Sequence, residues 1–208
     1  MPSTETAKRI LYYVHDPMCS WCYGFRPLWK QVQTQLPEDI TVRYVVGGLA
    51  PDSADPMPEI MQNGLQATWQ RITQAIPGTQ FNFDFWTQNQ PRRSTYPACR
   101  AVLAAKQQDS SKEIAMVEGI QNAYYRQAKN PSDDDTLIAV AEQIGLDTQQ
   151  FANDLNSEDT QRALRDEIRF ARSIGGDSFP SLILEQRDGY HILQLSYTDS
   201  SKLLVQLA

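Results

Sequence analysis

The chain has 208 residues, of which 41% are hydrophobic and 21% charged, and its net charge is −6. This composition is ordinary for a soluble globular protein, and the negative charge argues against nucleic acid or an anionic membrane as the main partner. Because the apolar run near the start is too short for a signal-peptide core, and none approaches the roughly 18 residues of a membrane helix, we expect a cytoplasmic protein without a membrane span.

The first fifty residues show two strand patterns around a helix pattern. Residues 9–15 and 40–46 are rich in β-branched and aromatic residues, which predicts two buried strands. Between them, over residues 24–36, apolar residues recur at spacings of three and four, which predicts a helix that Pro37 stops. The order predicts a βαβ unit with parallel strands and a right-handed crossover.

Helical patterns dominate the middle of the chain. We predict helices at residues 58–76, 96–108, 112–129, 134–144, 148–156 and 158–174. Residues 81–86 alternate aromatic and polar side chains as a strand does, but they have no obvious partner strand. A strand and an aromatic lid or packing segment both stay open there.

Strand patterns return after Gly175 and Gly176. Residues 181–185 and 190–195 flank an Asp-Gly pair, which predicts a β-hairpin, and residues 199–207 form an amphipathic helix pattern. The element order predicts an α/β protein with a discontinuous domain, residues 1–50 and 175–208, and a helical insertion domain, residues 51–174.

Two of the three cysteines lie where the first strand should turn into a helix. Cys19 and Cys22 are three positions apart, so they share a helix face and can form a disulfide. In the first turn, the sulfur of Cys19 would meet free N–H groups, which favour a thiolate. This pattern predicts thiol–disulfide exchange, in which Cys19 reacts with the substrate and Cys22 resolves the mixed disulfide. Zinc needs about four ligands, and Cys99, His15 and His191 have no paired ligand spacing, so we expect no metal site.

A proline opens the predicted strand at residue 181. Such a proline marks a sheet edge, a turn or a cis peptide bond. The aromatic residue before it, Phe179, modestly favours cis, although the local sequence alone favours a trans Pro180.

Two motifs in this order of elements resemble the DsbA family of the thioredoxin-like superfamily, and within it the FrnE-like, cytoplasmic DsbA-type proteins. They are Asp-Pro-Met-Cys-Ser-Trp-Cys-Tyr-Gly-Phe at 16–25 and Ser-Phe-Pro-Ser-Leu at 178–182. The resemblance covers nearly the whole chain, and it implies a thioredoxin-like fold with a large helical insertion.

The resemblance also implies roles for individual residues. It makes Cys19 the exposed nucleophile, Cys22 the buried resolving thiol and Pro180 a cis-proline that faces Cys19, and it places Phe179 in contact with the substrate chain. Ser20 and Trp21 lie between the two cysteines and are further candidates for substrate contact.

The sequence departs from DsbA between the cysteines, where DsbA has Pro-His and this chain has Ser20-Trp21. Because Trp21 cannot donate a charge to Cys19, we expect a less oxidising pair, whose thiolate is supported by helix N–H groups and the Ser20 hydroxyl. The physiological direction, oxidation, reduction or isomerisation, stays open.

The predicted function is DsbA-type exchange of disulfides with protein or peptide thiols. This function needs no cofactor beyond the Cys19–Cys22 disulfide, and glutathione is a candidate co-substrate. We expect the protein to be a monomer or a homodimer. Two alternatives remain. One is a glutathione-dependent transferase or isomerase on the same fold, although such relatives generally lack the paired cysteines. The other is a peptide-binding module without catalysis.

Several residues near the motif have two interpretations each. His15 either tunes Cys19 or is a hydrogen-bonded structural histidine, and Asp16 either caps the active-site helix or turns the chain. Cys99 is either a packed apolar cysteine or a third redox thiol at the cleft. The aromatic residues of the motif and of 81–86 form either a floor for substrates or part of the core. The arginines at 92, 93 and 100 are either solvated or bind an anionic ligand.

Overall fold

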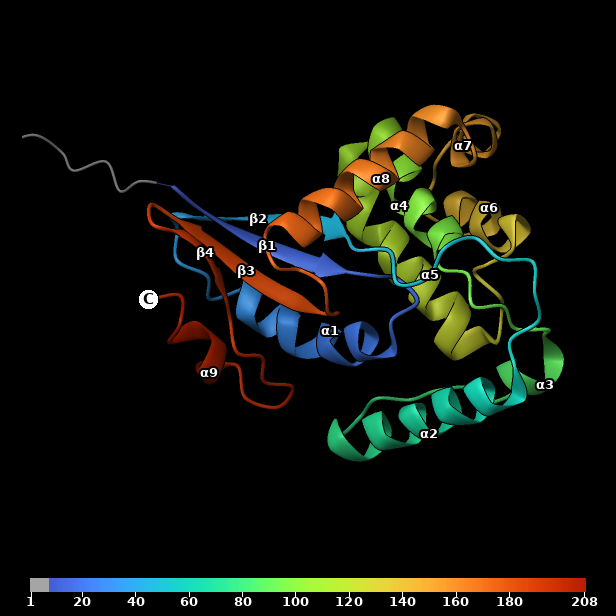
Figure 1. Cartoon of the computed structure of the whole chain (residues 1–208), viewed down its shortest axis with the longest axis horizontal. Coiled ribbons are helices and arrows are strands. Elements are labelled where there is room, and N and C mark those ends of the chain that lie inside the picture. The colour runs from blue at the N-terminus through green and yellow to red at the C-terminus, as the bar shows by residue number, and fades with distance from the viewer. Residues whose placement is uncertain (1–7) are drawn as a thin grey trace, which may run out of the picture.

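The computed structural model describes residues 8–208, and its centre is a four-stranded sheet with the strand order β2-β1-β3-β4 (Figure 1). β1 (Arg9–His15) pairs in parallel with β2 (Ile40–Val46), which confirms the predicted βαβ unit. β3 (Ser181–Gln186) runs antiparallel to β1 and forms the predicted hairpin with β4 (Gly189–Ile192).

Helices cover both faces of this sheet, because the side chains of β1 alternate between two cores. On one face, Leu11 and Tyr13 pack against α1 (Ser20–Gln33) and the last short helix, α9 (Ser201–Leu204). On the other face, Tyr12 and Val14 pack against the end of α8 (Glu158–Ser173). The predicted α/β, thioredoxin-like fold class with a helical insertion is confirmed.

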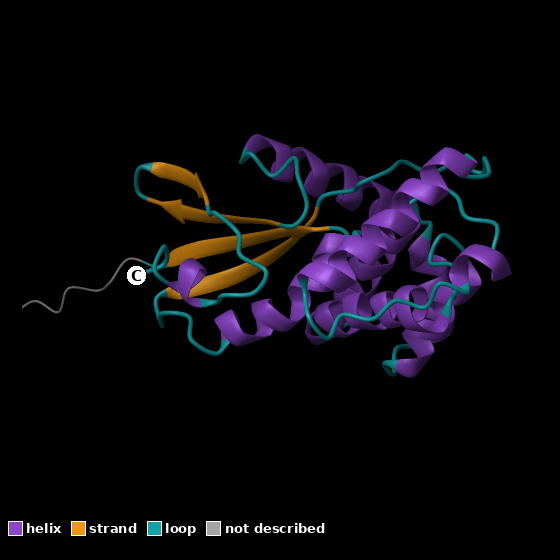
Figure 2. Cartoon of the chain, turned by 90° about the horizontal axis from the view of Figure 1, so that it is seen from below, coloured by secondary structure: helices purple, strands orange, loops and turns teal. Residues whose placement is uncertain are grey.

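The remaining helices lie beyond one end of the sheet, as Figure 2 shows. They are α2 (Glu59–Ala75), α3 (Phe85–Gln88), α4 (Tyr96–Gln108), α5 (Glu113–Gln127), α6 (Asp134–Gln143) and α7 (Thr148–Leu155), with the 3₁₀ turn η1 (Ser110–Lys112) before α5. α4 runs through the middle of this group and is buried along most of its length. The domain boundaries, residues 1–50 with 175–208 and residues 51–174, stay a prediction. The end of α8 belongs to the predicted insertion by its residue numbers, yet it packs on the sheet. None of the helices within residues 8–208 is long and apolar enough to cross a membrane.

Some predicted boundaries were wrong for reasons visible in the packing. α1 begins at Ser20 rather than at residue 24, because Gly24 is a close-packing position inside the helix: a Cβ there would lie 2.9 Å from Ile76. Residues 81–86 form no strand but a loop that leads into α3 and packs on the ring of Trp69. β4 and α9 are also shorter than predicted.

Candidate active site

The two cysteines of the motif occupy different positions at the start of α1. Cys19 is the N-cap residue and has no side-chain cap bond, so its side chain lies at the helix end where the first N–H groups are free. Cys22 lies one turn further on and is 1% exposed, compared with 7% for Cys19. Both are present as thiols. Cys19 is therefore the more accessible of the two, although most of its surface is covered.

The loop before β3 lies against Cys19. The peptide bond between Phe179 and Pro180 is cis, and the Cys19 thiol donates a hydrogen bond to the carbonyl oxygen of Phe179 at 3.5 Å. Pro180 is buried, whereas Phe179 is half-buried. The structure thus brings together three of the residues that the sequence predicted for the site, across 160 positions of the chain.

The ring of Phe179 packs on the backbone just after β2. A Cβ built on Gly47 would lie only 1.9 Å from Cε1 of Phe179, so no larger residue fits at that position without moving the ring. The Gly47 N–H in turn donates to the carbonyl oxygen of His15 at 2.7 Å. The ring is therefore used for packing, and the carbonyl group of Phe179 is the part that faces Cys19.

Cys22 is held as a neutral thiol. Burial is the largest cause that raises its pKa well above the ordinary value, followed by the hydrogen bond and the charge of Cys19. A buried thiol with a raised pKa is a poor nucleophile until its proton is removed. This environment suits a second cysteine that reacts only after the first.

Asp16 fixes the loop that precedes Cys19. Its carboxylate is 0% exposed and accepts bonds from the N–H groups of Met18 at 2.8 Å and Leu49 at 2.7 Å. It also accepts from the hydroxyl of Thr95 at 2.6 Å and the thiol of Cys99 at 3.4 Å. Asp16 caps no N–H group of α1 itself, so it joins the active-site loop to two other segments instead of capping the helix.

The residues between the cysteines face in different directions. Ser20 is buried, and its hydroxyl accepts a 2.9 Å bond from the indole N–H of Trp69 on α2. Trp21 is half-buried, and its ring lies edge-on to Tyr197 with a centroid distance of 5.0 Å. Sequence reasoning missed Tyr197, whose pKa is raised by burial and then by the charges of Cys22 and Cys19. Ser20 is thus a support within the core, and Trp21 is the better placed for substrate contact.

Most aromatic residues proposed as a substrate floor belong to the core. Tyr23 stacks on Tyr125 at 4.5 Å, and the Tyr125 hydroxyl donates to the carbonyl oxygen of Met18 at 2.7 Å. Phe85 and Trp86 are buried around Trp69. Their contribution to the site is a rigid support behind the active-site loop.

His15 ends β1 on the face that carries α1. It is 2% exposed, and its Nε2 atom has no hydrogen-bond partner among the described residues. Burial, and then the charge of Lys106, lowers its pKa to about 4. His15 is therefore a neutral imidazole, and the hydrogen-bonded structural role expected for it is wrong at Nε2.

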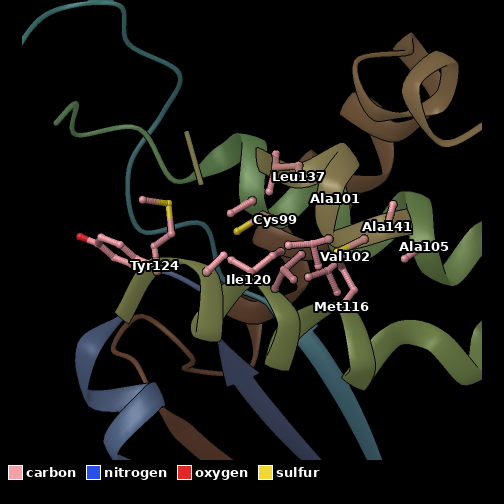
Figure 3. Close-up of a cluster of buried hydrophobic side chains, with 14 of the residues drawn as sticks. Cys99, Ala101, Val102, Ala105, Met116, Ile120, Tyr124, Leu137 and Ala141 are labelled. Atoms are coloured by element: carbon pink, nitrogen blue, oxygen red, sulfur yellow. The ribbon is translucent and has the colours of Figure 1, made fainter. Parts of the chain in front are cut away.

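Cys99 lies in the core of the helical group and not at an open cleft. It is 0% exposed on α4, among the apolar side chains of α4, α5 and α6 (Figure 3). Burial is the largest cause that raises its pKa well above the ordinary value, followed by the charge of Asp16. The packed interpretation describes this position better than a third redox thiol does.

Two of the arginines suggested for an anionic ligand already have partners in the chain. Arg100 is buried and makes two bonds to the carboxylate of Asp52, at 2.8 and 2.9 Å. Arg92 bonds to Asp133 and to the carbonyl oxygen of Ser132. Within residues 8–208, no group of three or more His, Cys, Asp or Glu side chains is arranged to hold a metal ion.

Comparisons with known proteins identify the family of the chain. The sequence model of the family described as thioredoxin matches residues 12–203. The chain belongs to the thioredoxin family. The predicted DsbA-type membership is confirmed by this match together with the structural neighbours.

Two solved structures cover nearly the whole of this thioredoxin-family chain. One is a protein of Nitrosomonas europaea, with a TM-score of 0.82 and 24% identity over 96% of this chain and 95% of that one. The other is the cytosolic disulfide reductase DsbM of Pseudomonas aeruginosa, with a TM-score of 0.73 and 25% identity over 95% of this chain and 93% of that one. DsbM has also been solved with GSH.

A curated sequence relative has a different role in its name. It is the ClpXP adapter protein SpxH of Halalkalibacterium halodurans, 25% identical over 179 residues, which are 83% of this chain and 57% of SpxH. The chain thus spans little more than half the length of this relative. The fold is that of disulfide oxidoreductases, while the sequence relatives bear the name of an adapter.

Proposed function

We propose that the protein is a DsbA-type thiol–disulfide oxidoreductase that exchanges disulfides with protein or peptide thiols through Cys19 and Cys22. One observation carries the proposal: the Cys19 thiol lies at a helix start against the carbonyl oxygen of Phe179, with the neutral thiol of Cys22 buried behind it. A structural disulfide would not need one thiol accessible and the other held back.

The reaction in the reducing direction has two steps. The Cys19 thiolate attacks a substrate disulfide, which forms a mixed disulfide and releases one substrate thiolate. Cys22 then loses its proton and attacks Cys19, so the Cys19–Cys22 disulfide forms and the second substrate thiolate leaves. Two electrons pass from the protein to the substrate, and no cofactor other than the dithiol takes part.

The substrate chain lies, in this proposal, across the loop of Phe179 and Pro180 and beside Trp21. The half-buried ring of Trp21 with Tyr197 offers an apolar contact next to Cys19, and Ser20 holds the motif from within. Glutathione is a candidate co-substrate, and the name and GSH structure of DsbM support this choice and a cytoplasmic location.

Insulin reduction by dithiothreitol tests the proposal. We expect the native chain to accelerate insulin precipitation and Cys19→Ser to abolish the acceleration, since Cys19 makes the first bond. Absence of any acceleration, or acceleration that persists in Cys19→Ser, would contradict the proposal.

Binding without turnover is the second candidate, and the adapter name of the sequence relatives favours it. It predicts that a protein partner binds the Cys19→Ser/Cys22→Ser double variant as tightly as it binds the native chain, and that neither form turns insulin over. Insulin turnover by the native chain therefore supports the first function, and tight binding by the double variant without turnover in either form supports the second.

A further inference from the structure

A small cavity lies behind the resolving cysteine, between α1, α5 and the adjoining face of the sheet. Its volume is about 50 Å³, and both Cys22 and His15 line it. A water molecule needs about 10–15 Å³ of such space and two or more polar partners. The cavity therefore has the room to hold water, and the side chains of Cys22 and His15 both border it.

His15 is the unusual member of this lining. Buried polar atoms in folded proteins nearly always have a hydrogen-bond partner, yet Nε2 of His15 has none among the described residues. A buried polar atom without a partner lowers the stability of the fold, and His15 is only 2% exposed, so a functional task would explain why this cost is tolerated. His15 and Cys22 line the same cavity, and this shared lining points to a role for His15 at Cys22.

We propose that His15 accepts the proton that Cys22 loses when it resolves the mixed disulfide. This inference rests on the proposed oxidoreductase function and adds a residue to it. The proton of Cys22 passes across the cavity to Nε2 of His15, the Cys22 sulfur bonds to Cys19, and the bond from Cys19 to the substrate sulfur breaks. The substrate leaves as a thiolate that takes a proton from solvent, and His15 returns its proton to solvent.

Asp16 also lies near Cys22, but its carboxylate is already in use. Its two oxygens accept bonds from Met18, Leu49, Thr95 and Cys99. A proton on Asp16 would compete with these bonds, which hold the active-site loop. Nε2 of His15 has no such bond to lose.

The environment of His15 suits an internal transfer of a proton rather than a lasting charge. Burial opposes a charge on either group alone, but a proton that moves from Cys22 to His15 creates two opposite charges that attract each other and no net charge. The titratable and charged groups around His15 and the cavity are Tyr13 on β1, Tyr44 on β2, Cys22, Arg26 and Lys30 on α1, Lys106 on α4, and Glu113 and Glu118 on α5. Lys30 is paired with Glu118 at 2.6 Å and Lys106 with Glu113 at 2.8 Å, so carboxylates offset the two lysines.

Stopped-flow reaction of the reduced chain with a limiting amount of DTNB separates the two steps. The first thionitrobenzoate is released when Cys19 attacks, and the second when Cys22 resolves the adduct. In the native chain we expect the second rate constant to be nearly independent of pH between about pH 5.5 and pH 8, because neutral His15 takes the proton throughout that range.

In His15→Phe, solvent hydroxide must remove the proton instead, so the second rate constant should rise about tenfold per pH unit and be about 10²-fold lower than native at pH 6. His191→Phe makes the same change at the exposed hairpin histidine and should leave both phases unchanged. A packing defect alone would lower the rate without changing its dependence on pH.

Two results would overturn the inference: a native second phase that itself rises tenfold per pH unit, or a His15→Phe second phase that stays independent of pH. If His15→Phe does not fold, His15→Gln serves, because a neutral amide cannot accept the proton and should give the same steep profile. Absence of the Cys19-dependent first phase would instead contradict the proposed function, so the two failures are distinguishable.

Discussion

Gly47→Ala is a small substitution that should act on the active site through one ring. The new Cβ would lie 1.9 Å from Cε1, 2.4 Å from Cζ and 2.8 Å from Cδ1 of Phe179, whereas ordinary contacts exceed about 3.4 Å. The ring must therefore move by more than an ångström, and the Phe179 carbonyl that faces Cys19 moves with it. Overpacking of this kind costs about 1–3 kcal/mol, and a displacement of about 1 Å can slow a reaction about 10²-fold.

Two assays measure these effects. The free energy of unfolding should fall by about 1–3 kcal/mol, which lowers Tm by about 2–4 °C per kcal/mol for a chain of this size. The first DTNB phase should also slow. Gly64→Ala is the matched control, because nothing lies within 4 Å of its Cβ inside α2, and it should stabilise the helix by about 0.5–1 kcal/mol without a change in rate. A Gly47→Ala variant with native stability and a native first phase would refute the packing role of Phe179.

Three further predictions concern pH, the third cysteine and the redox potential. The pKa of His15 is lowered to about 4 in the folded state, so the stability that its neutral form allows is present above its unfolded pKa of about 6.5 and is lost as the pH falls towards 4. Urea titrations should show that the free energy of unfolding falls by about 3 kcal/mol less in His15→Phe than in the native chain between pH 7 and pH 4. Parallel curves for the two proteins would contradict this. Cys99→Ser should keep most of the insulin-reductase activity, because the Cys99 thiol is fully buried and a serine hydroxyl can still donate to Asp16, while near-total loss would show that Cys99 is catalytic. The reduction potential, measured in glutathione redox buffers, should lie between those of thioredoxin (about −270 mV) and DsbA (about −120 mV), because Trp21 supplies no charge to Cys19; a value at or beyond either end would show that another group sets it.

Local patterns were sufficient to predict the framework. The β-branched and aromatic residues of β1 and β2 and the helical spacing between them specify a parallel βαβ unit, because such a crossover has few alternatives. The hairpin of β3 and β4 follows from its Asp-Gly turn in the same way. These elements are determined by residues close together in the sequence, so a single sequence is sufficient to predict them.

Contacts between distant segments were not predictable in this way. Aspartate is common in turns and at helix caps, and only the folded chain shows that the Asp16 carboxylate accepts hydrogen bonds from Leu49 and Thr95. The aromatic residues at 81–86 alternate like a strand because they surround Trp69 from a loop. Tyr197 belongs to no recognisable motif. It lies at the site because the chain after β4 returns to α1, where its ring contacts Trp21 and Phe25.

Gly24 and Gly47 show the same limit at positions that look unremarkable. The apolar spacing placed the helix start at residue 24, whereas the small size of Gly24 lets Ile72 and Ile76 pack against it inside α1. Glycine at residue 47 suggested the end of a strand, whereas it also leaves space for the ring of Phe179. The partner in each case lies more than 45 positions away.

Capture of a mixed disulfide tests the central claim most directly. The reduced Cys22→Ser variant, incubated with a peptide disulfide, should accumulate a covalent adduct, because the first step proceeds and the resolving thiol is missing. Mass spectrometry of the digested adduct should place the peptide on Cys19, with no adduct on Cys99. An adduct confined to Cys99, or no adduct at all, would contradict the assignment of Cys19 as the nucleophile of a disulfide-exchange enzyme.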